Sequence, residues 1–312
     1  MSRSVFERVV ASFGVVFGAV TLIFLILNWL PGDPAALIAG EGASDQTISQ
    51  LRRQLGTDRP ILRQYREYLV GLAHGDLGKS YVTHEPVISR LACQLPSTAS
   101  LTLAASAVAI VLGVALGLFS ALHEGRWVDR AVQGFVLGVV SIPPFWLGIL
   151  LILLFAVKLR VLPVIGDGGW LAAVLPVSCL GLVGSVPLVR MVRNSVVENR
   201  HDPYVTTLWA KGLGEQRIVY VHVLRNVLMA TVTLLSVLVG ELLSGAVIIE
   251  TLFARQGIGR LTVEAIGQKD LPMVQGAILL ASVCFVVVNL LVDLAYILID
   301  PRTRLVTARG LR

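Results

Sequence analysis

The sequence predicts an all-α integral membrane protein with six transmembrane helices and a small external cap between the first two helices. Hydrophobic residues make up 55% of the 312 residues and charged residues only 15%, and the mean hydropathy is +0.78. A soluble domain has about 45–50% apolar and about 25% charged residues. Since a core of this size cannot bury so much apolar surface, lipid must cover part of it. These proportions exclude a soluble enzyme.

Six apolar runs are each long enough to cross a bilayer, which takes about 20 residues of helix. They span residues 9–30, 97–122, 131–157, 170–189, 227–252 and 273–299. The first run follows Arg3 and Arg8, as the apolar part of a signal peptide would. Because it exceeds the roughly 7–15 residues of such a part, we expect a retained first helix.

The distribution of Lys and Arg predicts that both termini are cytoplasmic. The two tails and the loops on their side hold 14 of the 26 Lys and Arg residues, and the short loops opposite hold 5. Short cytoplasmic loops are enriched in these residues, whereas long translocated segments escape the rule. The net charge of +6 therefore reflects membrane topology rather than nucleic-acid binding.

We expect the chain to divide into four parts. Residues 1–30 form the cytoplasmic N-terminus and first helix, 31–96 an external segment, 97–299 a five-helix core containing a cytoplasmic loop at 190–226, and 300–312 a cytoplasmic tail. The external segment mixes acids and bases, and its residues 47–55 and 60–73 have helical apolar spacing. This cap is too small to be expected to fold as an independent domain.

Two features inside the spans predict bends and close packing. Pro143 and Pro144 should kink the third span, because proline removes a helical hydrogen bond. Small residues at four-residue spacing let helix backbones approach closely in lipid, within the chain or against a partner. The pairs are Gly14 and Gly18, Gly113 and Gly117, Gly134 and Gly138, and Gly240 and Ser244.

Catalytic and metal-binding constellations are not apparent in the sequence. Cys93, Cys179 and Cys284 form neither a disulfide framework nor a CxxC pair, and the five histidines are scattered. Residues 73–80 approach the phosphate-binding pattern GxxxxGK[ST], but Ala73 replaces its first glycine and a helical pattern precedes it. The spans contain no Ser/His, HExxH or paired-carboxylate arrangement, so we do not expect an intramembrane enzyme.

The largest cytoplasmic loop, 190–226, predicts a short helix with clear ends. Asp202 can cap free backbone N–H groups with its carboxylate, and Pro203 suits the first helical position. Lys211 suits the negative end of the helix dipole, and Gly212 permits a left-handed exit.

This short helix should be amphipathic, because Val205, Leu208 and Trp209 fall on one face at helical spacing. An apolar face of this kind needs a place to be buried. Two alternatives stay open on the residues alone. The face can lie on the membrane surface or neighbouring loops, or it can dock into a groove on another protein.

Short motifs occur in a specific order over nearly the whole chain. They are LPGDP at 30–34, GDLG at 75–78, SIPPFWLG at 141–148, YVTTLWAKGL at 204–213, LRN at 224–226, ETLF at 250–253, GIG at 257–259, KDLP at 269–272, NLLVD at 289–293 and DPR at 300–302. In this order they resemble the inner-membrane permease subunits of ABC importers, specifically the dipeptide, oligopeptide and nickel permease family.

The resemblance implies a type I ABC importer permease fold and a non-enzymatic subunit that imports di- or oligopeptides by alternating access. A metal chelate such as nickel is the alternative substrate. The chain would hold no cofactor, because ATP and Mg would bind to two separate cytoplasmic ATPase subunits. A homologous second permease subunit and an extracytoplasmic binding protein would complete the assembly in the bacterial inner membrane.

The resemblance also identifies the 203–213 helix as the coupling helix that docks on an ATPase. The residues implied are Tyr204, Val205, Leu208, Trp209, Ala210, Lys211, Gly212 and Leu213. Leu208 and Trp209 depart from the smaller-then-basic pair that the family usually has here.

Acidic residues inside the spans are expensive and often functional. Asp293 lies roughly two helical turns before Asp300 and Arg302, which favours an ion pair near the cytoplasmic face. For Glu241, near Ser244, a pathway role and a structural role stay open. The candidate pathway or gate residues are Glu241, Ser244, Pro143 and Pro144.

A different class of function is an ion-gradient-driven secondary transporter or channel. Such a protein would be expected to show an inverted repeat and a chain of intramembrane charges. The sequence shows no such repeat, and Glu241 and Asp293 are isolated acids rather than a chain of charges, so we favour the ATP-driven importer.

Overall fold

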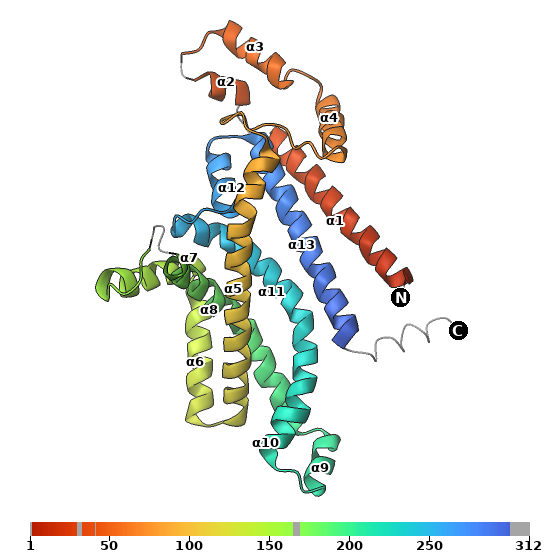
Figure 1. Cartoon of the computed structure of the whole chain (residues 1–312), viewed down its shortest axis with the longest axis vertical. Helices are drawn as coiled ribbons and strands as arrows, with labels where there is room; N and C mark the ends of the chain where they lie inside the picture. The colour runs from red at the N-terminus through yellow and green to blue at the C-terminus, as the bar shows by residue number, and fades with distance from the viewer. Residues whose placement is uncertain (1, 30–32, 41, 165–168, 300–312) are drawn as a thin grey trace. The chain divides into compact units, whose positions relative to one another are not determined.

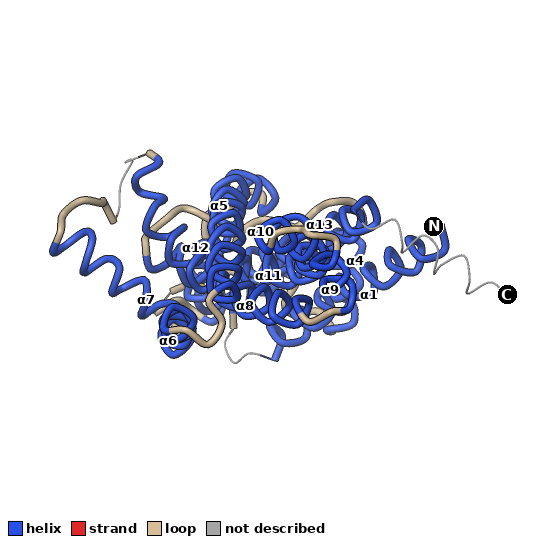
Figure 2. The backbone as a smooth tube through the Cα atoms, turned by 90° about the horizontal axis from the view of Figure 1, so that it is seen from below, coloured by secondary structure: helices blue, strands red, loops and turns tan. Residues whose placement is uncertain are grey.

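The computed structural model describes residues 2–29, 33–40, 42–164 and 169–299. Every regular element in these ranges is helical, apart from one isolated bridge between Lys79 and Pro86 (Figure 2). The all-α prediction is therefore confirmed. The chain forms two compact units, the first made of Met1–Thr98 and Gln256–Val286, and the second of Ala99–Arg255 and Val287–Arg312.

The first unit contains four N-terminal helices and a pair near the C-terminus (Figure 1). They are α1 (Ser2–Trp29), α2 (Pro34–Ala39), α3 (Asp45–Leu55), α4 (Ile61–Ala73), α12 (Ile258–Gly267) and the first part of α13 (Leu271–Ile299). The start of α5 (Val87–Leu122) also belongs to it. The two helices predicted in the external segment are confirmed as α3 and α4.

Local capping explains where the short helices of the first unit begin. Asp33 Oδ1 accepts a hydrogen bond of 3.0 Å from the backbone N–H of Ala35, and Pro34 occupies the first position of α2. At the start of α3, Ser44 Oγ accepts a hydrogen bond of 3.2 Å from the backbone N–H of Thr47. Each cap satisfies a donor that the first helical turn leaves free.

Aromatic packing joins α4 to α1. The rings of Phe24 and Tyr68 stack with centroids 5.7 Å apart, and the ring of Tyr65 lies 5.1 Å from that of Phe24. The hydroxyl of Tyr65 also lies 2.7 Å from Oγ1 of Thr21. Phe24 is thereby buried, and the contact fixes α4 against α1.

A tight turn follows α4. It contains most of residues 73–80, whose sequence approaches the phosphate-binding pattern. Ser80 Oγ donates to the carboxylate of Asp270 and accepts the N–H of Thr83 at 3.0 Å. Asp270 also accepts the N–H of Tyr81 at 3.0 Å. Ser80 and Asp270 are only 1% and 2% exposed, and burial together with the nearby Asp270 carboxylate raises the pKa of Tyr81. The serine here holds a turn in place.

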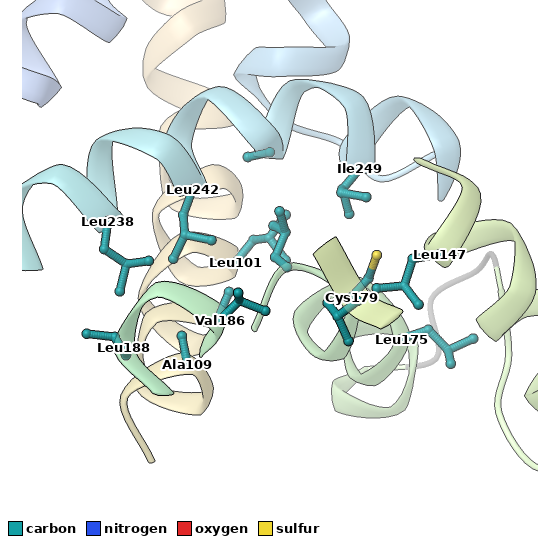
Figure 3. Close-up of a cluster of buried hydrophobic side chains, with 14 of the residues drawn as sticks. Leu101, Ala109, Leu147, Leu175, Cys179, Val186, Leu188, Leu238, Leu242 and Ile249 are labelled. Carbon is teal, nitrogen blue, oxygen red and sulfur yellow. The ribbon is translucent and has the colours of Figure 1, made fainter. Parts of the chain in front are cut away.

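The second unit contains the rest of α5 and the elements from α6 to α11. They are α6 (Trp127–Ser141), α7 (Pro144–Leu151), the π-helix η1 (Ile152–Lys158), α8 (Trp170–Arg200), α9 (Pro203–Ala210), α10 (Glu215–Arg217), the π-helix η2 (Ile218–Val223) and α11 (Leu224–Leu252). Figure 3 shows the centre of this unit, where side chains from α5, α7, α8 and α11 meet, among them Leu101, Leu147, Cys179 and Leu242.

Small residues let α5 and α8 approach closely, as the glycine spacing predicts. A Cβ atom on Gly113 would lie 2.4 Å from Cβ of Leu188, and one on Gly117 would lie 2.8 Å from Cβ of Val192. No alanine-sized group fits at those distances. At Gly134, by contrast, no described atom lies within 4 Å of an added Cβ, so the pair on α6 does not pack within this unit.

The third predicted span is broken rather than kinked. The helices Trp127–Ser141 and Pro144–Lys158 meet at 106°. Ile142 and Pro143 both have extended backbone conformations. Each precedes a proline, and the ring of a proline disfavours the helical conformation of the residue before it. Two consecutive prolines therefore stop the helix and start a new one in another direction.

Within the described residues, four single helices are long and apolar enough to cross a membrane, and the bent pair can supply a fifth span. The four are Val10–Trp29, Val87–Leu122, Trp170–Arg200 and Leu271–Val292. The predicted fifth span falls on the continuous helix α11, which is not among these helices. The count of six spans therefore stays a prediction. α5 starts at Val87, well before residue 97, because Val87 and Leu91 are buried in the first unit.

Candidate functional site

The helix α9 lies between α8 and α11. It begins at Pro203, as predicted, but ends at Ala210, short of the predicted end at residue 213. Pro203 stands at its first position and Asp202 precedes it in an extended conformation. The carboxylate of Asp202, however, caps none of the described N–H groups, so the predicted side-chain cap is wrong. The N–H of Val205 already pairs at 3.0 Å with the backbone carbonyl of Asp202, and proline offers no N–H at all.

The end of α9 is a left-handed turn, as predicted. Gly212 has a φ of +79°, and its N–H donates to the carbonyl of Trp209 at 2.8 Å. The N–H of Leu213 then donates to the carbonyl of Leu208 at 3.2 Å. This exit satisfies the last carbonyls of the helix and suits glycine, which has no Cβ to clash at positive φ.

One face of α9 is buried in an apolar cluster, called here the Val205 cluster. Val205 is 0% exposed. The other buried members come from α5, α8, η2 and α11 and are Leu118, Ala121, Val192, Val196, Ile218, Val219, Val223 and Val227. Tyr204, Leu208 and Leu213 pack at its edge. Figure 1 shows α9 and α10 at the same end of the second unit as the turn between α5 and α6.

Trp209 does not share this buried face, which corrects the sequence prediction. Its side chain is 45% exposed and lies outside the Val205 cluster. The cluster includes Tyr204 and Leu208, which shifts the centre of the buried face away from Trp209. Thr206, Trp209 and Ala210 instead form an outward face at i, i+3 and i+4 spacing, and all three are exposed.

A polar contact joins the start of α9 to the start of α11. Nδ2 of Asn226 donates to Oη of Tyr204 at 3.4 Å. Nearby, a guanidinium nitrogen of Arg200 at the end of α8 pairs with Glu215 of α10, and another donates to the carbonyl of Ala121 at 3.4 Å. The elements around α9 are thus tied to one another by polar as well as apolar contacts.

Sequence reasoning missed a buried ion pair close to this loop. Arg193 of α8 donates from Nε to Oδ1 of Asp129 at 2.8 Å and from Nη2 to Oδ2 at 2.7 Å. The same carboxylate accepts from Ser120 Oγ at 2.6 Å and from the N–H of Gly125 at 3.1 Å. Asp129 is 4% exposed. The sequence signal for it is an acid two residues before the predicted span that begins at residue 131.

The candidate pathway residues lie at two separate places in the second unit. Pro143 and Pro144 form the break between α6 and α7. Glu241 and Ser244 lie on one exposed face of α11. In the described part of the chain, no hydrogen bond or ion pair involves Glu241. The side chain of Asp293 lies outside the described residues, so its predicted ion pair stays a prediction.

Metal-binding geometry is not found among the described residues. No group of three or more His, Cys, Asp or Glu side chains in those ranges is placed to hold a metal ion.

Two family sequence models match the chain. The model described as "Binding-protein-dependent transport system inner membrane component" matches residues 113–305. The model described as "Binding-prot-dependent transport system membrane comp, N-term" matches residues 1–102. The first match contains the whole α8–α11 loop, including α9.

Similar proteins match over the full length. A peptide transport system permease protein of Brucella abortus (strain 2308) is 39% identical over 312 residues, covering 97% of this chain and 99% of that protein. The glutathione transport system permease protein GsiC of Escherichia coli O6:H1 is 37% identical over 304 residues, with the same coverage. A solved structure of the MetNI methionine ABC transporter in an inward-facing conformation has a TM-score of 0.56 at 19% identity, covering 68% of this chain and 97% of that chain.

Proposed function

Because the chain belongs to the family of binding-protein-dependent transport system inner membrane components, we propose that it is the membrane subunit of an ABC importer that carries peptides. Relatives named for peptide and glutathione transport support this substrate class, since glutathione is itself a small peptide. The likeness to an ABC transporter supports the type I permease fold. The chain is a multi-pass protein of the inner membrane, and both termini face the cytoplasm in our proposal.

The importer works with partner proteins. Its family is defined by dependence on a binding protein, and an ABC importer takes its energy from ATPase subunits. In our proposal two ATPase subunits bind ATP and Mg in the cytoplasm, and a homologous second permease subunit completes the path. This chain supplies no covalent chemistry and holds no cofactor of its own.

The helix α9 is the coupling helix in this proposal, and the buried Val205 side chain is the observation that carries it. Val205 contacts residues of α5, α8, η2 and α11 in one apolar cluster. Packed interiors transmit displacement because they are as dense as molecular crystals. A push on α9 would therefore move the ends of those helices together instead of bending a loose loop.

The outward face of α9 is the surface that meets the ATPase. Thr206, Trp209 and Ala210 are exposed on it, and a half-exposed tryptophan is a typical anchor at a protein interface. We assign this face to a groove on an ATPase subunit rather than to lipid. Closure of the ATPase pair would move α9, and rigid-body rocking of the spans would open the path to the other side of the membrane.

Glu241 and Ser244 face the transport path in this proposal. A carboxylate that points into lipid from the middle of a span is expensive. The exposed Glu241 carboxylate on α11 avoids this cost if its surface faces water and the second permease subunit instead of lipid. There the carboxylate can attract the N-terminal ammonium of a peptide. The break at Pro143 and Pro144 can act as a gate, since it joins two helices without regular hydrogen bonds across it.

Reconstitution tests the proposed function. The chain, its second permease subunit and its ATPase subunits are placed in liposomes, and uptake of radiolabelled trialanine is measured with binding protein and ATP. We expect uptake only when all components and ATP are present. Uptake by this chain alone, driven by an ion gradient, would instead identify a secondary transporter.

A further inference from the structure

A cavity of about 490 Å³ lies in the first unit, where the segment predicted to be external meets residues of the first and last predicted spans. Residues of α1, α3, α4 and α13 and the segments between them line it. Pockets of roughly 300–1,000 Å³ are typical of small-molecule sites. The volume is therefore suited to a ligand the size of a short peptide.

Four side-chain amides line this cavity. They are Asn28, Gln54, Gln64 and Gln275. A carboxamide both donates and accepts hydrogen bonds, which is the pattern that a peptide group presents. The lining therefore offers both donors and acceptors to a peptide backbone.

Paired charges of both signs border the cavity. Nε of Arg52 donates to Oδ2 of Asp33 at 2.7 Å, and Nη1 of Arg59 donates to the two carboxylate oxygens of Glu67 at 2.8 and 2.7 Å. Each guanidinium has further N–H groups that can donate to a carboxylate, and each acid has further lone pairs that can accept from an ammonium. The Arg59 and Arg63 guanidiniums hold the pKa of Glu67 below its usual range, so the acid is charged at neutral pH.

An apolar wall completes the cavity. The rings of Phe24 and Tyr68 line it, together with the aliphatic side chains of Leu27, Leu55 and Val274. The hydroxyl of Tyr68 is buried and has no hydrogen-bond partner among the described residues. A buried hydroxyl without a partner commonly gains its hydrogen bond from a bound polar molecule.

We propose that this cavity is a binding site for a short zwitterionic peptide, held by Arg52 and Arg59 at its carboxylate and by Asp33 and Glu67 at its ammonium. The inference rests on the proposed function, peptide import. It adds a site on the permease itself, apart from the separate binding protein. Peptide released by that protein would be retained here before it crosses the membrane.

Equilibrium dialysis of radiolabelled trialanine tests this site. The complete permease and ATPase complex is held in lipid nanodiscs without binding protein and without ATP. We expect saturable binding to the wild-type complex. Arg52→Gln should weaken it about tenfold, as expected for loss of one charged hydrogen-bonding group. N-acetyl-trialanine amide, which lacks both terminal charges, should compete poorly.

Arg53→Gln is the matched control, because Arg53 is the next residue of α3, is exposed and does not line the cavity. It should bind trialanine like the wild type. A second pair serves if Arg52→Gln fails to fold. Gln275→Leu changes a lining residue and should weaken trialanine binding, whereas Gln268→Leu changes a residue outside the lining and should not. Absence of saturable binding, or equal loss in the Arg52 and Arg53 variants, would overturn the proposal.

Three further outcomes distinguish failure of this binding site from failure of the proposed peptide import. If the binding protein shields the cavity residues from chemical labelling and trialanine does not, the peptide site is overturned and the cavity is a contact for that protein. Full ATP-driven uptake with no trialanine binding would reject the cavity and leave peptide import standing. Absence of trialanine uptake by the complete wild-type reconstitution would reject peptide import itself.

Discussion

Arg193 of α8 holds the carboxylate of Asp129 of α6 through two parallel hydrogen bonds of 2.8 and 2.7 Å. The pair lies next to Val192, a member of the Val205 cluster. It fixes the turn between α5 and α6 against α8 at the end of the unit that carries α9. The elements that would move with α9 are therefore tied together by charge as well as by apolar packing.

Removing one partner of this pair should destabilise the chain strongly. In Asp129→Ala the partly buried Arg193 guanidinium loses both carboxylate bonds, and Ser120 and the N–H of Gly125 lose their acceptor, which together should cost about 3 kcal/mol of unfolding free energy. Denaturant titration in detergent micelles measures the change. Arg63→Ala is the control, because its pair with Glu67 is exposed and should contribute less than about 0.5 kcal/mol. Equal effects would show that the buried pair contributes no more than a surface pair.

The two faces of α9 should respond differently to truncation. Val205→Ala removes buried methyl groups and should lower the unfolding free energy by about 2 kcal/mol. Trp209→Ala removes an exposed side chain, so it should leave stability unchanged and weaken co-purification of the ATPase. Unfolding titration and pull-down of the ATPase separate these results. Normal ATPase association in Trp209→Ala would contradict the assigned docking face.

The left-handed exit from α9 should be needed for coupling. Gly212→Val places a β-branched residue at a φ of +79°, which costs about 1–2 kcal/mol and shifts the end of the helix. No described atom lies within 4 Å of an added Cβ, so the effect comes from backbone strain and not from a clash. We expect peptide uptake per ATP hydrolysed to fall in proteoliposomes while membrane insertion is intact.

Gly214→Val is the matched control for this variant. Gly214 has an extended conformation that any residue adopts, and it also has open space around it. It should couple normally. Gly212→Asn should recover part of the coupling, because asparagine tolerates the left-handed region. If both valine variants transport normally, the exit geometry of α9 has no part in coupling.

Glu241 should affect transport without affecting folding. Glu241→Gln keeps the size of the side chain and removes its charge, so stability should change little at this exposed position. Uptake of trialanine should fall severalfold, whereas uptake of N-acetyl-trialanine should not, because that peptide lacks the ammonium. Unchanged uptake of both peptides would remove Glu241 from the transport path.

Alkaline pH should loosen the packing of α4 on α1. Burial raises the pKa of Tyr68 to about 12, above the value of about 10 for an exposed tyrosine. The folded state therefore holds this proton more tightly than the unfolded state, so stability is full below about pH 10 and falls as the pH rises toward 12. Tyr68→Phe should remove this part of the pH dependence. The exposed Tyr220 offers the control Tyr220→Phe, which should keep it.

The sequence predicts the features that depend on neighbouring residues. Asp202 and Pro203 mark the start of α9, Gly212 marks the left-handed turn after it, and the glycine pair at 113 and 117 marks a close helix contact. The face that α9 buries was harder to predict. Val205, Leu208 and Trp209 fit one face of an isolated helix, but contact with Tyr204 and the cluster turns Trp209 outward.

Interactions between distant segments could not be predicted in this way. Asp129 and Arg193 are 64 positions apart, and their pairing depends on how α6 and α8 align in space. The break at Pro143 was predicted only as a kink, because one proline bends a helix, whereas two in succession also force the residues before them into extended conformations. The cap by Asp202 failed because its own backbone carbonyl takes the N–H of Val205.

Site-specific cross-linking tests most directly whether α9 docks on the ATPase. Single cysteines replace Thr206, Trp209 or Ala210 on the outward face, or Val205 on the buried face, in a chain whose Cys93, Cys179 and Cys284 are changed to serine. A reagent with a maleimide at one end and a photoreactive group at the other is then attached to the single cysteine, and the complex assembled with its ATPase is irradiated. We expect the three outward positions to cross-link to the ATPase and position 205 not to do so. Absence of cross-links from all three outward positions, in a complex that still imports trialanine, would contradict the account.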